Sequence, residues 1–223
     1  MTTKTIAITG ATGQFGAIAL DLLKAKQANV IALVRSPEKI SGVEAHKFDY
    51  SKTEGQVEAL QGVDTLILVS SSEVGQRALQ HNNVIESAKK AGVKHIIYTS
   101  LLGTTNDNTV KSLAGEHVET EAALKASGIT YTILRNGWYT ENYTASIPAA
   151  LANNAFYGSA KNGKISSVLR AELAEAAVNV ALSEGHENQT YELAGSTSWT
   201  LADLAAEISK QTGKDIPYVD IPA

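Results

Sequence analysis

GATGQFG, residues 10–16, decides the fold, because it joins a short apolar run at residues 5–9 to a helical pattern that begins near Gln14. Its glycines stand at positions 10, 13 and 16. In a strand, turn and helix unit, the first glycine permits a tight turn, the second lets a pyrophosphate approach the backbone, and the third lets helix and strand pack closely. The helix N-terminus adds unpaired N–H groups and a positive dipole that attract phosphates. Glycine also serves ordinary turns, but both flanks match the motif, so we predict dinucleotide binding.

Apolar strand-like runs alternate with helical segments through the first 135 residues. Such alternation is typical of a parallel sheet whose strands are joined by helical crossovers. Gly92 and Gly128 follow two of the helical segments, where glycine commonly ends a helix. The predicted fold class is therefore α/β, with a doubly wound parallel sheet of the Rossmann type. The expected strands are residues 6–9, 30–34, 43–48, 65–69, 95–99 and 131–134, and the expected helices are residues 15–26, 53–61, 73–91 and 112–127.

The rhythm changes after Arg135. A segment rich in glycine, asparagine and aromatic residues leads there into shorter elements, expected as a helix at 170–183, a strand at 190–193 and a helix at 201–211. We predict two parts within a single compact unit: a dinucleotide-binding Rossmann core at residues 1–135, and a small C-terminal α+β substrate lobe at residues 136–223. We expect the lobe to pack on the carboxyl edge of the sheet, where the cofactor lies and a cleft admits the substrate.

The amino-acid composition argues against several classes of function. The 223 residues carry a formal net charge of −4, 43% hydrophobic residues and no cysteine. No cluster of lysine and arginine gives the footprint of a surface for nucleic acid or membrane, so we expect neither partner. Without cysteine there is no disulfide, thiolate nucleophile or zinc–sulfur site, which fits a reducing compartment. No signal peptide or membrane-length apolar run is found, and we predict a soluble, cytoplasmic protein.

Arg35 ends the second predicted strand, where a cofactor with a free ribose 2′-hydroxyl is usually met by Asp or Glu. A guanidinium suits the 2′-phosphate of NADP through charge-assisted hydrogen bonds, whereas an acid would repel it. An arginine at a strand end can also be simply solvated, but this position favours NADP. Asp49, after the third strand, either reaches the adenine amino group or forms a turn before Ser51.

Hydroxyl side chains follow two further strands. Ser70, Ser71 and Ser72 come after the fourth predicted strand, and Thr99 and Ser100 come after the fifth. Hydroxyls at the carboxyl ends of central strands are placed to bind ribose or nicotinamide. One of the three serines is also expected to cap the helix that begins near residue 73, and the two roles are compatible.

The segment after the sixth strand, residues 136–141, has amide, backbone and aromatic groups that could hold a nicotinamide ring against a flat acceptor. Trp138 and Tyr139 have an alternative interpretation as ordinary packing residues, because large aromatic side chains dominate protein cores.

The helix expected after the fifth strand lacks the tyrosine and lysine, four residues apart, with which short-chain dehydrogenases reduce ketones or epimerise sugars. Tyr157 has a lysine at that distance, Lys161, but the run between them is rich in turn residues and is not this helix. The helix instead carries His117 and Glu121 one turn apart. No third ligand is spaced to join them, so a solvated or packed pair is favoured and no metal site is predicted.

Five strings carry a resemblance to one family: GATGQFG, SSSEVGQR at residues 70–77, YTSLLG at 98–103, RNGWYTENY at 135–143 and YELAG at 191–195. From its first strand to about Tyr218 the chain resembles the type 2 quinone oxidoreductases, which are NmrA-like, atypical short-chain dehydrogenases. The resemblance implies NADPH-dependent reduction of a small quinone by hydride transfer from the nicotinamide. It also accounts for the missing tyrosine and lysine, because a quinone accepts hydride with little acid assistance.

The resemblance also implies which residues serve the cofactor, and it makes Tyr139 the proton donor. The implied cofactor-binding residues are Gly10, Ala11, Thr12, Gly13, Gln14, Phe15, Arg35, Ser70, Ser71, Ser72, Asn136, Gly137, Trp138, Tyr139, Thr140 and Glu141.

One departure from the family concerns length. Proteins of this kind usually continue for several tens of residues past Ile221, whereas this sequence stops at Ala223. A shorter lobe implies weaker substrate binding, exposed apolar surface, or closure by a partner subunit in a homodimer. It leaves open a second class of function, an NADP-binding regulatory protein that senses redox state without turnover, as other NmrA-like proteins do.

Overall fold

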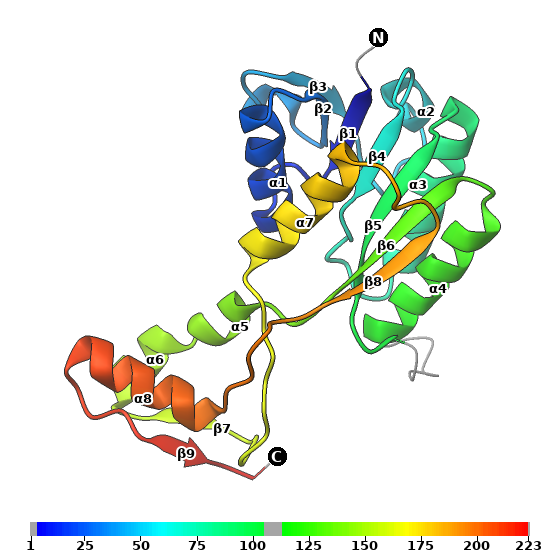
Figure 1. Cartoon of the computed structure of the whole chain (residues 1–223). Helices are drawn as coiled ribbons and strands as arrows, with labels where there is room; N and C mark the ends of the chain where they lie inside the picture. Colours follow the sequence, from blue (N-terminus) through cyan, green and yellow to red (C-terminus); the bar gives the residue numbers. More distant parts are fainter. Residues whose placement is uncertain (1–3, 105–112, 223) are drawn as a thin grey trace. The chain divides into compact units, whose positions relative to one another are not determined.

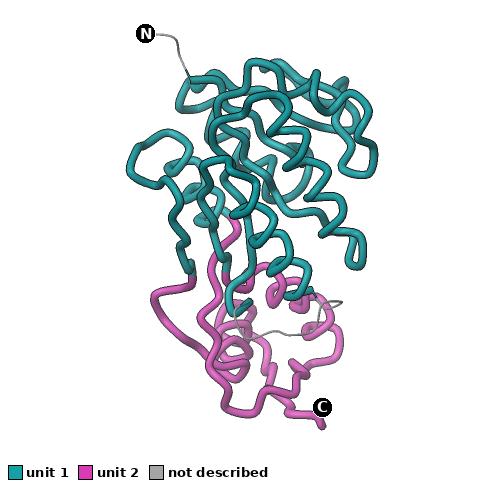
Figure 2. Tube along the Cα trace, turned by 90° about the vertical axis from the view of Figure 1, so that its right-hand side faces the viewer, with its two compact units in different colours: residues 1–136, 171–193 teal, residues 137–170, 194–223 magenta. Residues whose placement is uncertain are grey.

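A computed structural model describes residues 4–104 and 113–222 of the chain. The chain divides into two compact units, shown in teal and magenta in Figure 2: residues 1–136 with 171–193, and residues 137–170 with 194–223. The boundary at residue 136 lies one residue from the predicted one. Residues 171–193, which the sequence pattern assigns to the substrate lobe, lie in the first unit instead.

Within the described residues, the first unit is built on a seven-stranded sheet in which every neighbouring pair is parallel. The order of strands reverses direction between β1 and β4, as in a doubly wound fold. The prediction of a Rossmann-type α/β fold is confirmed. In spatial order the strands are β3 (Glu44–Lys47), β2 (Asn29–Val34), β1 (Thr5–Thr9), β4 (Thr65–Leu68), β5 (His95–Leu101), β6 (Thr130–Asn136) and β8 (Gln189–Leu193) (Figure 1).

Helices cover both faces of this sheet (Figure 1). On one face lie α1 (Gln14–Ala25) and α7 (Arg170–Leu182), and on the other lie α2 (Gln56–Ala59), α3 (Arg77–Ala91) and α4 (Leu113–Ala126), with a short 3-10 turn η1 (Pro37–Lys39) after β2. Gly92 ends α3 in the left-handed region, at a φ of 79°, as predicted. The expected start of α4 at residue 112 lies outside the described residues.

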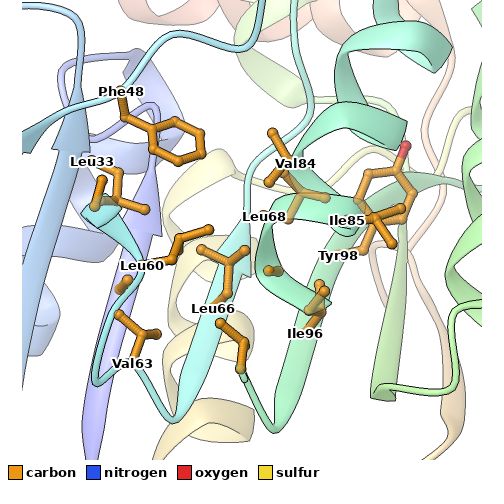
Figure 3. Close-up of a cluster of buried hydrophobic side chains, with 14 of the residues drawn as sticks. Leu33, Phe48, Leu60, Val63, Leu66, Leu68, Val84, Ile85, Ile96 and Tyr98 are labelled. Atoms are coloured by element: carbon orange, nitrogen blue, oxygen red, sulfur yellow. The ribbon is translucent and has the colours of Figure 1, made fainter. Parts of the chain in front are cut away.

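The face under α2, α3 and α4 buries an apolar cluster, shown in Figure 3. Leucine, isoleucine and valine side chains from β4 and β5 meet those of α3 there, and burial of each contributes roughly 1.5–3 kcal/mol before the entropy cost of folding. Labelled members of the cluster are Leu33, Phe48, Leu60, Val63, Leu66, Leu68, Val84, Ile85, Ile96 and Tyr98. Because β4 is buried on both faces, it reads as a continuous apolar run, which is typical of a central parallel strand.

The edge strand β8 explains why the division into units differs from the expected one. It pairs with β6 from Thr132↔Gln189 to Asn136↔Leu193, so it completes the Rossmann sheet. Its side chains are half-buried or exposed, and it therefore lacks the apolar signature of the other strands. Sequence periodicity reveals the strand, whereas its membership in the sheet depends on a partner more than fifty residues away.

The second unit contains three helices and a parallel pair of strands within the described residues. They are α5 (Thr140–Thr144), α6 (Ile147–Asn153), β7 (Phe156–Gly158), α8 (Leu201–Thr212) and β9 (Tyr218–Asp220). A capping box between Thr200 and Asp203 begins α8, and Gly213 ends it. The unit has its own small core, made of Ala150, Phe156, Leu201, Ala205, Ile208 and Ile216.

Among the described residues, no helix combines the length and the apolar character that crossing a membrane requires.

Candidate functional site

The loop after β1 has the geometry of a phosphate cradle. Gly10 has a φ of +62°, and its carbonyl accepts a hydrogen bond of 2.8 Å from the Gly13 N–H, which closes a tight turn. A Cβ placed on Gly16 would lie 2.2 Å from the Gly10 oxygen, so a glycine is required where α1 leaves the loop. Gly13, the N-cap of α1, makes no side-chain cap. The first N–H groups of the helix therefore remain available for an anion at the switch between β1 and β4.

Arg35 follows β2 directly, one strand away from this loop in the sheet. Its side chain is exposed, and no ion pair within the described ranges involves it. Asp49 accepts a hydrogen bond of 3.0 Å from the Ser51 N–H on its Oδ1. The turn-forming interpretation of Asp49 is therefore the one seen in the structure.

The segment after β4, residues 70–76, is held from within the protein. Ser71 is its anchor: the Ser71 N–H donates to His81 Nε2 (2.9 Å), and the Ser71 carbonyl accepts from Arg77 Nε (2.6 Å). The Ser71 hydroxyl donates to the Gln80 side chain and accepts from the Glu73 N–H (3.2 Å). Every polar group of Ser71 thus has an internal partner.

The flanking serines differ from Ser71. The Ser70 N–H donates to Thr99 Oγ1 at 2.8 Å, so the Thr99 hydroxyl is engaged with the backbone of the neighbouring loop. Ser100, which is buried, donates to Glu121. Ser72 is exposed. Of the five hydroxyls predicted at this edge, Ser70 and Ser72 are the two that keep no side-chain hydrogen bond within residues 4–104 and 113–222.

The predicted serine cap on the helix after β4 is wrong. Helix α3 begins at Arg77 rather than near residue 73, and its N-cap, Gln76, makes no side-chain hydrogen bond. The cap comes from Glu116 on α4: its Oε1 accepts from the N–H groups of Gly75 and Arg77, both at 2.9 Å. Glu116 Oε2 also pairs with Arg77 Nη1 at 2.9 Å, and both side chains are at most 5% exposed.

Sequence reasoning missed Glu116. It lies 39 residues from Arg77 along the chain, and an acid in the first turn of a helix normally signals nothing beyond its favourable position in the helix dipole.

His117 and Glu121 are packed residues, as the favoured interpretation holds. His117 Nδ1 lies 2.6 Å from the Tyr98 hydroxyl. Glu121 accepts hydrogen bonds from Ser100 Oγ (2.6 Å) and from Arg135 Nε and Nη2 (3.0 and 2.8 Å). Burial, and after it the positive charge of Arg77, lower the pKa of His117 to about 4. In the part of the chain that the structure describes, no group of three metal-ligating side chains could hold an ion.

Asn136 ends β6, beside the end of β5, and is 3% exposed. Its backbone carbonyl accepts from the Leu102 N–H at 2.9 Å, but neither Nδ2 nor Oδ1 of its side chain has a hydrogen-bond partner among the residues that the structure describes. The Thr104 hydroxyl, which sequence reasoning also missed, is likewise buried and has no hydrogen-bond partner in the described part of the chain. Buried polar groups without partners are rare because their desolvation is uncompensated. A buried amide with a free donor and a free acceptor is a candidate contact for a ligand that offers both.

The remaining predicted residues, 137–141, lie in the second unit. Trp138 and Thr140 exchange backbone hydrogen bonds with Val168: the Val168 N–H donates to Trp138, and the Thr140 N–H donates to Val168. Trp138 is 48% exposed, so the interpretation of this residue as core packing does not hold. The run is a short extended segment tied at its backbone.

Two side chains of this run meet Arg170. The Glu141 carboxylate accepts from the Arg170 N–H (3.0 and 3.2 Å), and the Arg170 guanidinium carbon lies 4.7 Å from the centre of the Tyr139 ring. Tyr157 and Lys161 lie elsewhere in this unit, on β7 and in a left-handed turn, so they do not form the helical pair of classical dehydrogenases.

Comparisons with known proteins agree with this geometry. A family described as NAD(P)H-binding matches residues 10–184. Quinone oxidoreductase 2 of Escherichia coli is 52% identical to the chain, over 97% of this chain and 77% of its own length. The crystal structure of an NADPH-dependent quinone oxidoreductase of Escherichia coli complexed with NADPH has a TM-score of 0.91 at 50% identity, covering 97% of this chain and 78% of that one.

A more distant relative is the NmrA-like family domain-containing oxidoreductase of Aspergillus flavus, which is 33% identical over 94% of this chain and 72% of its own length. The predicted resemblance is confirmed. The chain belongs to the NAD(P)H-binding family and, within it, to the quinone oxidoreductase 2 group of NmrA-like, atypical short-chain dehydrogenases.

Proposed function

We propose that this protein reduces small quinones with NADPH. The observation that carries the proposal is its 52% identity, across nearly the whole chain, with quinone oxidoreductase 2 of Escherichia coli. The glycine loop after β1, whose conformation only glycine at position 16 permits, supports it. The regulatory alternative is not favoured, because the Escherichia coli and Aspergillus flavus relatives, which are 52% and 33% identical over 97% and 94% of the chain, are both named as oxidoreductases.

The residues at the carboxyl edge of the sheet fit NADPH. The N–H groups at the start of α1 suit the pyrophosphate. The Arg35 guanidinium, exposed at the end of the neighbouring strand β2, suits the 2′-phosphate. The amide of Asn136, whose donor and acceptor have no partner within residues 4–104 and 113–222, matches the carboxamide of nicotinamide, which offers an acceptor and a donor in return.

When bound, NADPH supplies a hydride to the quinone. The chain's own residues then have two tasks. Residues 137–140 position the ring of the cofactor, and the Glu141 carboxylate, whose oxygens are occupied by the Arg170 N–H, holds this run in shape. The Tyr139 hydroxyl donates a proton to the quinone oxygen that gains negative charge, and water restores that proton. One hydride and one proton convert the quinone into a hydroquinone.

The proposal is tested by following the absorbance of reduced nicotinamide with purified protein, a simple benzoquinone, and either NADPH or NADH. We expect quinone-dependent oxidation that prefers NADPH, after subtraction of the uncatalysed reaction. Tight binding of NADPH without turnover would contradict the enzyme and favour the sensor. Failure to bind NADPH at all would contradict both.

Replacement of Arg35 tests the choice of cofactor. Arg35→Ala removes a charge-assisted contact and should weaken NADPH by about 10- to 100-fold while leaving NADH nearly unchanged. The matched control is Lys26→Ala, which removes an exposed cation at the opposite end of α1. Equal losses for the two cofactors, or for the two variants, would overturn the assignment of Arg35.

Two expectations about surroundings belong to the same proposal: a cytoplasmic location and a homodimer. The absence of cysteine from the sequence supports the first. Exposed apolar side chains in the second unit, such as Tyr157 at 53% and Trp138 at 48%, support the second. Sedimentation of the purified protein distinguishes a monomer from a dimer.

A further inference from the structure

Glu116 lies in α4, which follows α3 in the chain, whereas the segment that its carboxylate binds precedes α3. The chemistry of the proposed reaction does not use this carboxylate. We propose that Glu116, together with His81, is a positioning residue that holds residues 70–76 in their cofactor-binding shape before the cofactor arrives. The inference rests on the proposed function and on the prediction from the sequence that Ser70 and Ser72 of this segment bind NADPH. It adds residues that touch neither cofactor nor substrate.

Glu116 accepts three hydrogen bonds where the segment joins α3, one from the segment and two from Arg77. Its carboxylate accepts from the Gly75 N–H, from the Arg77 N–H and from the Arg77 guanidinium, each at 2.9 Å. Arg77 in turn donates from Nε to the Ser71 carbonyl at 2.6 Å. A single buried ion pair therefore connects α4 with both ends of the segment. An acid with one oxygen on backbone N–H groups and the other on a guanidinium cannot be replaced by a neutral side chain without leaving a donor unpaired.

His81 binds the start of the segment at Ser71, and the hydrogen bonds of His81 determine its protonation. Because the Ser71 N–H can only donate, His81 Nε2 must accept and carry no proton. The hydrogen of the neutral ring is then on Nδ1, which donates to Thr120 Oγ1 at 3.0 Å, and the Thr120 hydroxyl donates to the Glu116 carbonyl at 2.8 Å. This chain of donors and acceptors ends on the same residue of α4. A proton on Nε2 would face the Ser71 N–H and break this series of hydrogen bonds.

The consequence for function is preorganisation. A loop that is already fixed loses little conformational entropy when it binds a ligand, so its affinity is higher than that of a loop ordered by the ligand. The Ser70 and Ser72 hydroxyls lie on either side of the anchored Ser71 and gain their positions from it.

The first test needs no variant. Amide hydrogen exchange and ¹⁵N spectra of the histidine rings are measured on the full chain with and without NADPH. We expect slow exchange at Ser71, Gly75 and Arg77 in the cofactor-free protein, and an unprotonated Nε2 in His81 that is coupled through the hydrogen bond to the Ser71 amide nitrogen. Fast exchange at these amides that slows only when NADPH is added would overturn the inference.

The second test uses variants and separates positioning from general stability. Glu116→Gln and His81→Leu should each raise the dissociation constant of NADPH by about tenfold, the range expected for a lost buried hydrogen bond, and leave the KM for benzoquinone within about twofold. His81→Gln, which restores an acceptor at a similar reach, should recover most of the affinity. The matched control is Leu124→Ala, a cavity in the same helix that lies away from the segment.

The outcomes distinguish the two proposals. If the unmodified protein binds no NADPH, the proposed function fails. Exchange at the Ser71, Gly75 and Arg77 amides still reports whether Glu116 and His81 hold the segment. If it binds NADPH and Leu124→Ala weakens binding as much as Glu116→Gln does, Glu116 supports only the fold and the positioning role is refuted. Any variant that does not fold is replaced by the spectroscopic test on the unmodified chain.

Discussion

Two neighbouring loops at the carboxyl edge of the sheet reach a fixed shape by opposite means. The loop at residues 10–13, after β1, is shaped by its own backbone: a left-handed Gly10 and a turn hydrogen bond to Gly13. The segment at residues 70–76, after β4, has its shape imposed by Glu116 and by the α3 side chains Arg77, Gln80 and His81. The shape of the first loop is determined by seven consecutive residues, 10–16. The second depends on a carboxylate that lies about forty residues further along the chain.

The largest expected effect comes from breaking the imposed shape. Arg77→Met leaves the Glu116 carboxylate buried without its cation, which should lower the free energy of unfolding by about 3–5 kcal/mol. Chemical denaturation measures it. The double variant Arg77→Met with Glu116→Leu should cost less than Arg77→Met alone, because no uncompensated charge remains. A loss below about 1 kcal/mol in the single variant would show that the pair does not organise this region.

Low pH should destabilise the segment at residues 70–76 and leave the glycine loop at residues 10–13 unchanged. Burial lowers the pKa of His81 to about 3, and burial lowers that of His117 to about 4, against an unfolded value of 6.5. A histidine with a lowered pKa in the folded state stabilises above pH 6.5, and this contribution is lost as the pH falls toward the folded value. As the pH falls from 7 to 5, the loss of the contribution from each of these two histidines should reduce the free energy of unfolding by on the order of 1–2 kcal/mol.

Amide exchange at each pH locates that loss. The protection factors of the Ser71 and Gly75 amides, which correct for the intrinsic slowing of exchange in acid, should fall more steeply with acid than that of Gly13, and the slope should flatten in His81→Gln. His46 responds in the opposite sense, because its bond to the Ala59 carbonyl raises its pKa, so His46→Gln is the control. A uniform change across both loops would remove the contrast between them.

The glycine loop is tested by adding one methyl group. Gly16→Ala places a Cβ 2.2 Å from the Gly10 oxygen, and the forced shift should cost about 1–3 kcal/mol of stability and most of the affinity for both NADPH and NADH. Gly62→Ala is the control: Gly62, unlike Gly16, has a positive φ, but a Cβ there meets no atom within 4 Å. The control should lose about 1 kcal/mol of stability and keep its cofactor affinity. Equal cofactor affinities in the two variants would contradict the cradle.

The smallest effects separate two adjacent serines. Ser71→Ala removes hydrogen bonds to Gln80 and Glu73 and should cost about 1 kcal/mol. Ser72→Ala changes an exposed side chain and should alter stability by less than about 0.5 kcal/mol, yet weaken NADPH severalfold. Thermal unfolding and NADPH titration of the two variants provide the comparison. The reverse pattern would mean that Ser71 and not Ser72 is the ligand.

Features determined by residues close together in the chain were predicted correctly, whereas features that depend on residues far apart in the chain were not. The apolar run of β4 and the glycine that ends α3 were predictable, because a strand buried on both faces and a left-handed helix end each have a local residue signature. The start of α3 was misplaced by four residues because its cap is supplied by another helix. The edge strand β8 was recognised as a strand but assigned to the wrong unit, because its half-exposed side chains do not reveal its pairing with β6.

The candidate site divides in the same way. Arg35 and the glycines were identified from their positions at strand ends, and their cofactor contacts stay predictions. Glu141 was predicted to meet the cofactor, whereas the structure shows its carboxylate occupied by the Arg170 N–H. Nothing in the local sequence distinguishes a carboxylate that caps a backbone from one that faces a ligand.

By itself, then, the sequence determined the Rossmann class, the phosphate-binding turn and the family, because glycine geometry and apolar periodicity are properties of residues that adjoin in the chain. The tertiary structure alone decided that Glu116 binds the Gly75 N–H, that β8 completes the sheet, and that the amide of Asn136 is buried without a partner among the described residues. Each of these depends on which distant residues meet, and on which polar groups are left unpaired when they do.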